Sequence, residues 1–269
     1  MITDENIRQA AIAEISFPER EIGDSRYLLR FARDAHEVNA ALKLRFDIFN
    51  LELGEGLDAS YETQQDRDEF DAQCHHLLVF EKKSGAVIGT YRMQTKEMAD
   101  AAAGFYSSGE FDLSKMPDAV LKQSVEVGRA CITKKHRNGR VLFLLWQGLA
   151  MYMMHMRKRY LFGCCSLTSQ DPDEGKQVMM HLEAKGYVHT GFMVPPLPGL
   201  ACYPADFQPS SINKVKIPRL FRTYLNYGAK VCSLPVIDRL FKTIDYLVIL
   251  DIKGLEKQTF RLFFSGLKR

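Results

Sequence analysis

Short apolar runs mark the strands of this chain. They are rich in β-branched and aromatic residues, and they predict single strands at 27–32, 124–132, 160–168 and 245–252. Residues 76–94 hold two further runs joined by a short turn that ends at Gly85, which predicts a β-hairpin.

Apolar residues at helical spacing predict the helices. The predicted ranges are 35–53, 140–158, 171–187, 218–231 and 254–265. The first carries Phe46 and Phe49 on one side and ends before Gly54, a residue typical of helix ends. A polar stretch at 54–68, a helix with an irregular excursion at 96–122 and an irregular connection at 194–209 separate these elements. The order of elements predicts an α/β fold, in which a mixed central sheet carries helices on both faces.

Composition and charge narrow the class of protein. The 269 residues suit one large domain with an extension, and a net charge of +3 gives no reason to expect a nucleic-acid partner. Seven Lys/Arg lie between Lys214 and Lys242 against one acid, Asp238. That segment would suit an acidic protein or an anionic membrane, or it is a solvated basic helix. The longest apolar run, 141–154, is too short to span a bilayer.

Cysteine spacing indicates the redox environment. The six cysteines include no CxxC pair, and Cys164 and Cys165 are adjacent in a predicted strand. Such thiols are expected to be reduced, which predicts a cytoplasmic location. Cys74-His75-His76 is better explained by a strand edge than by a metal site, because no further ligands occur at recognisable spacing, and no metal is expected.

Two charges interrupt the predicted strand 124–132. Glu126 and Arg129 flank Gly128 in an otherwise apolar run, and charges are rarely buried unless they are paired or used. A bulge at Gly128 would leave a backbone N–H near Val127 and Gly128 to hold an oxyanion. The carboxylate of Glu126 would then take a proton from an incoming amine. The alternative is a salt bridge between Glu126 and Arg129 inside the sheet.

Two further groups of residues could serve the same chemistry. Where a loop enters the helix 140–158, backbone N–H groups and the helix dipole favour a phosphate, although an ordinary glycine turn is the alternative. The residues concerned are Arg137, Asn138, Gly139 and Arg140. Charged residues that could form one network are Arg45, Asp68, Asp71, Arg92, Glu126 and Arg129.

Several segments in order make the chain similar to a known family. They are LKLRFDIFNLELG, DEFDAQCHHLLVFEKKSGAVIGTYRM, VEVGRACITKKHRNGRVLFLLWQGLAMYM, YLFGCCSL and IPRLFRTYLNYGAKVCSLPVIDRLFKTIDYLVILDI. Together they resemble the bacterial N-acyltransferases of the ornithine-lipid type, often labelled hemolysin-like, which belong to the GNAT superfamily. A more distant similarity to acyl-homoserine-lactone synthases rests on residues matched in the same order: Arg45, Phe49, Asp68, Asp71, Arg92, Glu126 and Arg129.

The resemblance implies a fold and a reaction. The sheet would splay at 124–132, with an N-terminal segment at 1–25, a GNAT-like core at 26–190 and a helix–strand–helix extension at 191–269. A long-chain acyl group, with or without a 3-hydroxyl, would pass from acyl carrier protein to the α-amine of an amino acid, most often ornithine. In this reading the network residues would shape the acceptor pocket and its lid.

The resemblance also implies how the donor binds. Relatives that use acetyl-CoA carry Q/R-x-x-G-x-G/A, whereas residues 136–141 here match only the central glycine. That departure favours the phosphopantetheine phosphate of a carrier protein, with no tightly bound cofactor. Lys134 and Lys135 would add charge for an acidic carrier protein. Phe49, Phe143 and Trp146 would line an acyl-chain pocket, although a core role is the alternative.

Other functions remain open at the level of sequence. The acceptor could be glycine or another amino acid, or the protein could be a signal synthase that acylates S-adenosylmethionine and releases a lactone. A non-catalytic domain that binds carrier protein or membrane is the third reading. His136 and Cys131 are weaker candidates for a base and a nucleophile. The lipid product would place the enzyme at the inner face of the membrane as a peripheral protein.

Overall fold

The computed structural model describes residues 15–210 and 216–267, which form two compact units. The first unit takes its described residues from 15–105, 125–158 and 257–267, and the second from 106–124 and 159–256 without 211–215. Lys214 of the predicted basic segment and most of the predicted N-terminal segment lie outside the described residues. The expected division at residues 25 and 190 stays a prediction.

An antiparallel sheet forms the centre of the first unit. Its strands pair in sequence order: β1 (Ile22–Gly23), β2 (Tyr27–Phe31), β3 (His75–Glu81), β4 (Val87–Thr95) and β5 (Ser124–Ile132). Phe31 pairs with Leu77, and Leu77 with Tyr91, so these buried side chains share one face. The predicted hairpin 76–94 and the strands at 27–32 and 124–132 are confirmed.

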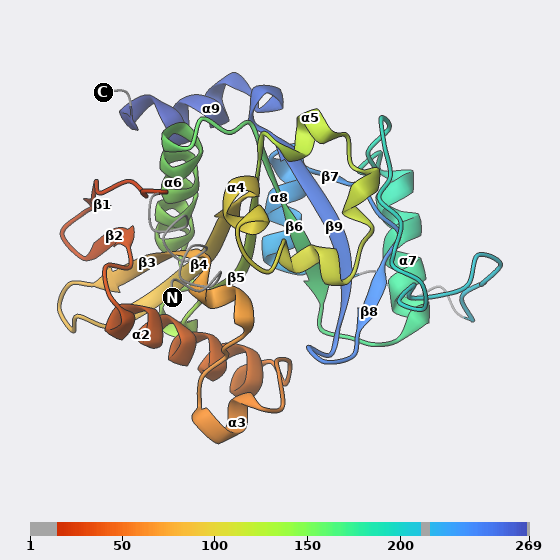
Figure 1. The fold of residues 1–269 in the computed structure, drawn as a ribbon, viewed down its shortest axis with the longest axis horizontal. Helices are drawn as coiled ribbons and strands as arrows, with labels where there is room; N and C mark the ends of the chain where they lie inside the picture. Colours follow the sequence, from red (N-terminus) through yellow and green to blue (C-terminus); the bar gives the residue numbers. More distant parts are fainter. Residues whose placement is uncertain (1–14, 211–215, 268–269) are drawn as a thin grey trace, which may run out of the picture. The chain divides into compact units, whose positions relative to one another are not determined.

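Two helices cover opposite faces of this sheet. α6 (Gly139–His155) lies against the face of Leu77, and at Gly148 an added Cβ would come within 2.5 Å of a Leu77 methyl carbon. Glycine at this position therefore lets helix and sheet approach closely. α2 (Ala35–Phe46) packs on β3 and β4 from the other face, where Arg92 points, because Arg92 follows Tyr91 along β4. α9 (Lys257–Phe264) lies across one end of α6 (Figure 1).

The helix predicted at 35–53 changes its winding part way along. Asp34 caps the start of α2 by accepting a hydrogen bond from the Glu37 N–H, and residues Asp47–Glu52 continue as a π-helix. Leu53 N–H accordingly bonds to the Ile48 carbonyl, five residues back, at 3.0 Å. Single π turns of this kind occur frequently at functional sites. Two short helices follow, α3 (Ser60–Thr63) and α4 (Lys96–Asp100).

The second unit is built around β9 (Thr243–Asp251). β6 (Tyr160–Leu167), β7 (Lys230–Val231) and β8 (Val236–Asp238) all pair with it in antiparallel register. Isolated parallel bridges, such as Val188 with Val231, make the pairing mixed. The helices of this unit are α5 (Asp118–Leu121), α7 (Pro172–Ala184) and α8 (Arg219–Asn226).

The predicted α/β fold class is confirmed, and the elements of the second unit differ from the prediction in detail. The helix expected at 218–231 is shorter, because Lys230 and Val231 pair with β9 instead. β8 was not predicted, since its three residues are too short to show a periodic pattern. The splay expected beside β5 stays a prediction. Among the described residues, no helix combines the length and the apolar character needed to cross a bilayer.

Candidate active site

A β-bulge interrupts β5 next to Glu126. Thr90 pairs with Cys131 but Arg92 pairs with Gly128, so Tyr91 stands opposite two residues, Arg129 and Ala130. The sequence analysis was therefore right to expect a bulge and wrong to centre it on Gly128. Gly128 stays in register, and a Cβ there would meet nothing within 4 Å.

The bulge turns the Arg129 side chain to the face of Glu126. In a regular strand residues 126 and 129 would point to opposite faces. Arg129 instead adopts φ = 50°, a left-handed conformation that costs a non-glycine residue about 1–2 kcal/mol. Its guanidinium reaches Asp68, which also pairs with Arg92 on the face of Glu126. Bulges commonly redirect a side chain in this way.

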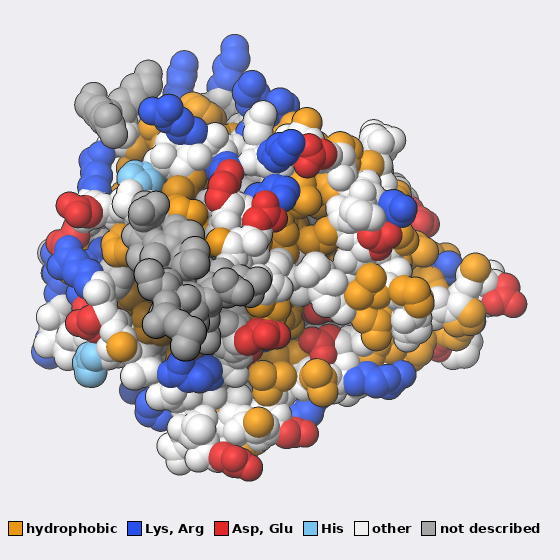
Figure 2. All heavy atoms as spheres, viewed as in Figure 1, with side chains coloured by type: hydrophobic (Ala, Val, Ile, Leu, Met, Phe, Trp, Pro, Cys, Tyr) orange, Lys and Arg blue, Asp and Glu red, His pale blue; other side chains and the backbone are white. Residues whose placement is uncertain are grey.

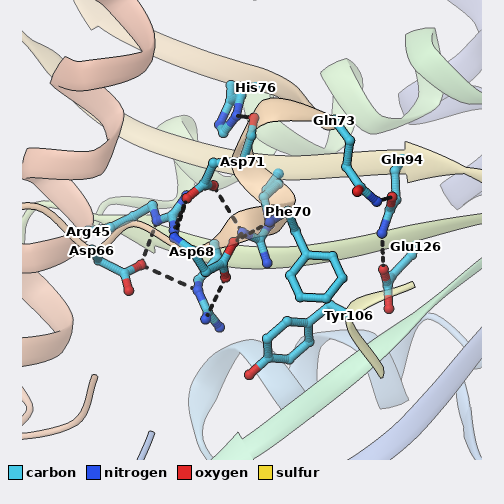
Figure 3. A network of polar contacts seen from close by, with 12 residues as sticks. Arg45, Asp66, Asp68, Phe70, Asp71, Gln73, His76, Gln94, Tyr106 and Glu126 are labelled. Atoms are coloured by element: carbon cyan, nitrogen blue, oxygen red, sulfur yellow. Dashed lines mark hydrogen bonds and ion pairs between the residues drawn. The ribbon is translucent and has the colours of Figure 1, made fainter. Parts of the chain in front are cut away.

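Three arginines and three aspartates form one buried ion-pair network (Figure 3). Arg45 Nε donates to Asp66 Oδ2 at 2.6 Å, and its Nη1 donates to Asp71 Oδ1 at 2.7 Å. Arg92 Nη1 donates to the same Asp71 oxygen at 2.9 Å and also to Asp68. Arg129 Nη2 donates to Asp68 Oδ2 at 3.0 Å, and Arg129 Nε lies 3.3 Å from Asp66 Oδ2. The formal charges of the six side chains sum to zero.

Burial makes this network electrostatically strong. The side chains of Arg45 and Asp66 are fully buried, and that of Asp71 is 1% exposed. Burial by itself would raise the pKa of the Asp71 carboxyl, but the charges of Arg45 and Arg92 outweigh it and hold the pKa well below its ordinary value. Asp71 is therefore ionised throughout the physiological range.

The segment DRDEFD is folded to present its acids together. Asp68 caps the 3₁₀ turn Glu69–Ala72 by accepting from Phe70 N–H, and Asp71 accepts from Asp68 N–H at 2.9 Å. Asp68 and Asp71 were predicted members of the network. Asp66 was missed, although it stands two residues before Asp68 in the same acidic segment.

Glu126 is joined to two buried glutamines that the sequence analysis did not single out. Gln94 Nε2 donates to Glu126 Oε2 at 2.6 Å, and Gln73 Nε2 donates to Gln94 Oε1 at 2.6 Å (Figure 3). Glu126 is 6% exposed, Gln94 is 1% exposed and Gln73 is 4% exposed. Gln94 pairs directly with Glu126 across β4 and β5. The sequence offers one signal for Gln94, which is that a polar residue lies inside a predicted strand.

The loop before α6 is held by its own polar contacts. Asn138 caps the helix, accepting from the N–H groups of Arg140 and Val141 at 3.2 Å. Arg137 donates to Glu52 at 2.8 Å, and Arg140 donates to Asp24 at 2.6 Å. The Tyr27 N–H, followed by the Arg140 guanidinium, lowers the pKa of Asp24 to about 2. The predicted role of residues 137–140 in holding a phosphate stays a prediction.

The three predicted acyl-chain residues lie on two elements. Phe143 and Trp146 project from α6 and each contacts the ring of Phe263 on α9, with ring centroids 5.7 Å apart. Phe49 is a buried residue of the π-helix. The predicted contact of these side chains with an acyl chain stays a prediction.

Four of the cysteines and histidines considered in the sequence are buried, namely Cys74, Cys131, His76 and His136. Burial raises the pKa of the Cys74 and Cys131 thiols, which therefore stay protonated. Burial lowers the pKa values of His75 and His76 to about 4, so both imidazoles are neutral near pH 7. His136 Nδ1 lies 3.1 Å from the hydroxyl of Tyr27.

One group of side chains in the second unit has the chemistry of a metal site. Glu110, Cys164 and Asp245 place three potential ligand atoms within 4.8 Å of one another. Cys164 Sγ lies 3.5 Å from Glu110 Oε2, as in a weak hydrogen bond. Two carboxylates and a thiol could bind a divalent cation, but three convergent ligands without further support do not establish one.

Comparison with known proteins places this site in context. Residues 44–147 match the family model described as an acetyltransferase (GNAT) domain. The L-ornithine N(alpha)-acyltransferase of Rhizobium meliloti (strain 1021) is 32% identical over 237 residues, which span 83% of this chain and 79% of that protein. The enzyme of the same name from Brucella abortus (strain 2308) is 30% identical over 246 residues, 86% of each protein.

A solved structure shows the same fold at low sequence identity. FeeM, an N-acyl amino acid synthase from uncultured soil microbes, aligns with a TM-score of 0.50 and 10% identity. The alignment covers 90% of this chain and 97% of FeeM. The likeness concerns the arrangement of helices and strands alone.

Proposed function

Because the chain belongs to the family of the L-ornithine N(alpha)-acyltransferases, we propose that it acylates the α-amine of L-ornithine with a long-chain acyl group carried by acyl carrier protein. The observation that carries the proposal is the 32% identity to the Rhizobium meliloti enzyme over 83% of the chain. The match of residues 44–147 to a GNAT domain supports acyl transfer as the reaction class. The family resemblance inferred from sequence is thereby confirmed.

Glu126 is the proposed general base. Its carboxylate takes a proton from the α-ammonium, directly or through a water, and the amine nitrogen attacks the thioester carbon. A backbone N–H of the segment 127–130, where β5 bulges, stabilises the oxyanion of the tetrahedral intermediate. The carbon–sulfur bond then breaks, the nitrogen loses its second proton to the leaving thiolate, and an amide and a free thiol remain. Buried ion pairs from Arg45, Arg92 and Arg129 keep the strand in position.

Glu126→Gln tests the assignment of the base. The substitution keeps the shape and the contact with Gln94 but removes the proton acceptor, so kcat should fall about 10²–10⁴-fold. The assay follows thiol release from acyl carrier protein on addition of L-ornithine, with mass spectrometry of the product. Turnover near the wild-type rate, with an unchanged circular dichroism spectrum, would remove Glu126 from this role.

The acceptor is tested with a matched panel of amines. L-Ornithine should react, whereas ornithine blocked at its α-amine should not. Norvaline, which lacks the δ-amine, measures what the second ammonium contributes, and glycine tests the nearest alternative acceptor. Lactone release from S-adenosylmethionine would instead identify a signal synthase. If none of these amines causes thiol release, only a binding function remains.

A basic surface on the first unit is the proposed docking site for the acidic carrier protein. The backbone N–H of Lys82 bonds to the Arg26 carbonyl, and Glu81 contacts both Arg26 and His136, which draws three chain segments together. The exposed cations of this basic surface are Arg26, Lys82, Lys83, Lys134, Lys135, Arg137 and Arg140. Complementary charge at such a surface accelerates and orients association.

Charge reversal separates docking from chemistry. The double variant Lys134→Glu/Lys135→Glu should raise KM for acyl carrier protein and leave KM for an acyl-pantetheine thioester unchanged. Lys257→Glu, an exposed lysine of α9, is the matched control. An equal change in KM for both donors would contradict docking at this surface.

Peripheral contact with an anionic membrane is part of the same proposal. In the predicted basic segment 214–242, Leu240 is 76% exposed and follows the exposed Arg239 in the turn between β8 and β9. α9 offers a second apolar and basic surface, where Phe260 is 42% and Leu262 is 52% exposed. Figure 2 shows Lys and Arg side chains gathered along the edge over this helix. Exposed apolar residues beside cations suit the interface of an anionic bilayer.

A further inference from the structure

Two buried glutamines form a hydrogen-bonded chain that ends on the proposed base. Gln73 donates to Gln94 Oε1, and Gln94 donates to Glu126 Oε2, both at 2.6 Å. The three side chains come from different segments, the loop before β3, β4 and β5. Such a buried chain of hydrogen bonds constrains how the Glu126 carboxylate can rotate.

The main chain fixes the direction of every hydrogen bond in this chain of amides. Ala103 N–H donates to Gln73 Oε1 at 2.9 Å, and Gln73 Nε2 donates to the Gly104 carbonyl at 2.8 Å. A backbone N–H can only donate and a carbonyl can only accept, so the Gln73 amide has one allowed orientation. Gln73 therefore turns an N–H toward Gln94, whose oxygen must accept and whose own NH₂ must face Glu126.

We propose that Gln94, oriented by Gln73, is a positioning residue that holds the Glu126 carboxylate in its charged form and in one rotational state for proton abstraction. This inference rests on the proposed function of Glu126. A hydrogen bond donated to a carboxylate stabilises the charged state over the protonated one. An amide neither gains nor loses a proton near neutral pH, so Gln94 cannot compete for the substrate proton.

Three charged or titratable groups near the carboxylate, Cys74, His76 and Arg92, do not change protonation near neutral pH. The Cys74 thiol, whose electrostatic neighbours include Glu126, is kept protonated because burial raises its pKa. His76, which pairs with Arg92 across β3 and β4, has its pKa lowered to about 4 by burial. Arg92 itself is paired with Asp68 and Asp71. A change in the hydrogen bond from Gln94 can therefore be followed through the acidic limb of the rate profile.

Substituting Gln94 should move the acidic limb of the pH profile of kcat/KM. Gln94→Leu removes a hydrogen bond to a charged group, so the limb should shift about one to two pH units to higher pH. Gln94→Glu keeps the shape and places a second carboxylate beside the first, which should shift the limb at least as far in the same direction. Gln73→Leu removes one of the contacts that orient the Gln94 amide, which still donates to the Gly104 carbonyl at 3.3 Å, and should shift the limb by less.

The measurement is kcat/KM for L-ornithine between pH 5 and pH 10, with thermal unfolding of each variant. Titration of the substrate amine also contributes to the limb, but equally in every variant, so a difference between variants belongs to the enzyme. The control is Gln177→Leu on α7, which removes another buried glutamine and should change the unfolding temperature without moving the limb.

Each outcome decides the matter. A shift in Gln94→Leu or Gln94→Glu and none in the control supports the positioning role. A limb that stays in place in a folded Gln94 variant overturns it, since a role confined to stability would lower the rate equally at all pH values. If Gln94→Leu fails to fold, the isosteric Gln94→Glu provides the same test. If Glu126→Gln is inactive and the limb of the Gln94 variants does not move, the positioning role alone is refuted. If Glu126→Gln is active, the proposed base is refuted.

Discussion

Replacing Arg45 by Met tests whether the buried ion-pair network is as tightly coupled as its geometry indicates. Arg45 is fully buried and donates to both Asp66 and Asp71. Methionine fills similar space but leaves two carboxylates in the core without that partner. Breaking one side of a buried pair costs about 3–5 kcal/mol, which is a large share of the 5–15 kcal/mol typical of a folded protein.

The assay is urea unfolding followed by the fluorescence of Trp146, the one tryptophan of the chain. At pH 7 the free energy of unfolding of Arg45→Met should lie about 3–5 kcal/mol below that of the wild type. Lys43→Met on the same helix is the matched control. Lys43 makes an exposed pair with Asp47 at 3.4 Å, so its loss should cost less than about 1 kcal/mol.

The pH dependence of this difference is a second, independent test. In the wild type, burial raises the pKa of Asp71, but the charges of Arg45 and Arg92 lower it by more. The pKa of Asp71 therefore lies below its unfolded value of about 3.9. The resulting stabilisation is present above that pH and is lost as the pH falls through the folded-state pKa. In Arg45→Met the Asp71 carboxyl protonates more readily than in the wild type, so the two stability curves should converge as the pH falls below about 4. Equal losses for Arg45→Met and Lys43→Met, or a gap that stays constant as the pH falls well below about 4, would refute the reasoning.

Three further predictions concern stability and surfaces. Burial lowers the pKa of His76 to about 4, below the unfolded value of about 6.5, so the stability that neutral His76 contributes is complete above pH 6.5 and declines toward pH 4. The free energy of unfolding of the wild type should therefore fall by about 2 kcal/mol between pH 7 and pH 5 because of this residue. In urea unfolding, His76→Asn should reduce this dependence of stability on pH. Gly148→Val should lower the free energy of unfolding by about 1–3 kcal/mol, because its side chain would collide with Leu77; an unchanged urea midpoint would contradict the close packing. Leu240→Asp should weaken flotation with anionic vesicles relative to neutral ones, and Leu51→Asp, at another exposed leucine, should not; no binding by the wild type would end the membrane proposal.

Local patterns were sufficient to predict most of the elements around the site. The hairpin 76–94 and the strand 124–132 follow from short apolar runs and a turn, and α7 follows from Pro172 at its start and Gly186, at φ = 68°, just beyond its end. These signals act over a few residues and need no knowledge of the rest of the chain. The predicted α/β class depends only on their order.

What the sequence did not reveal depends on register and on long-range pairing. Glycine commonly marks a bulge, but here the residue with positive φ is Arg129. In this conformation the Arg129 guanidinium forms ion pairs with Asp68 and Asp66. The role of Gln94 requires knowing that it stands opposite Glu126, and this register is not written in either strand alone. The π-helix after α2 likewise has no periodic signature that separates it from an α-helix.

The network explains why so many charges are buried beside a single carboxylate. Buried ion pairs lose much of their attraction to desolvation, so their presence is a poor explanation of stability alone. They do impose geometry, since a guanidinium bonded to two acids can satisfy both in few arrangements. Arg45, Arg92 and Arg129 come from α2, β4 and β5, and all three meet the acids of one short segment. The network therefore holds the bulged strand from the face on which Glu126 lies, and in the arrangement that we propose the glutamine chain positions the carboxylate itself.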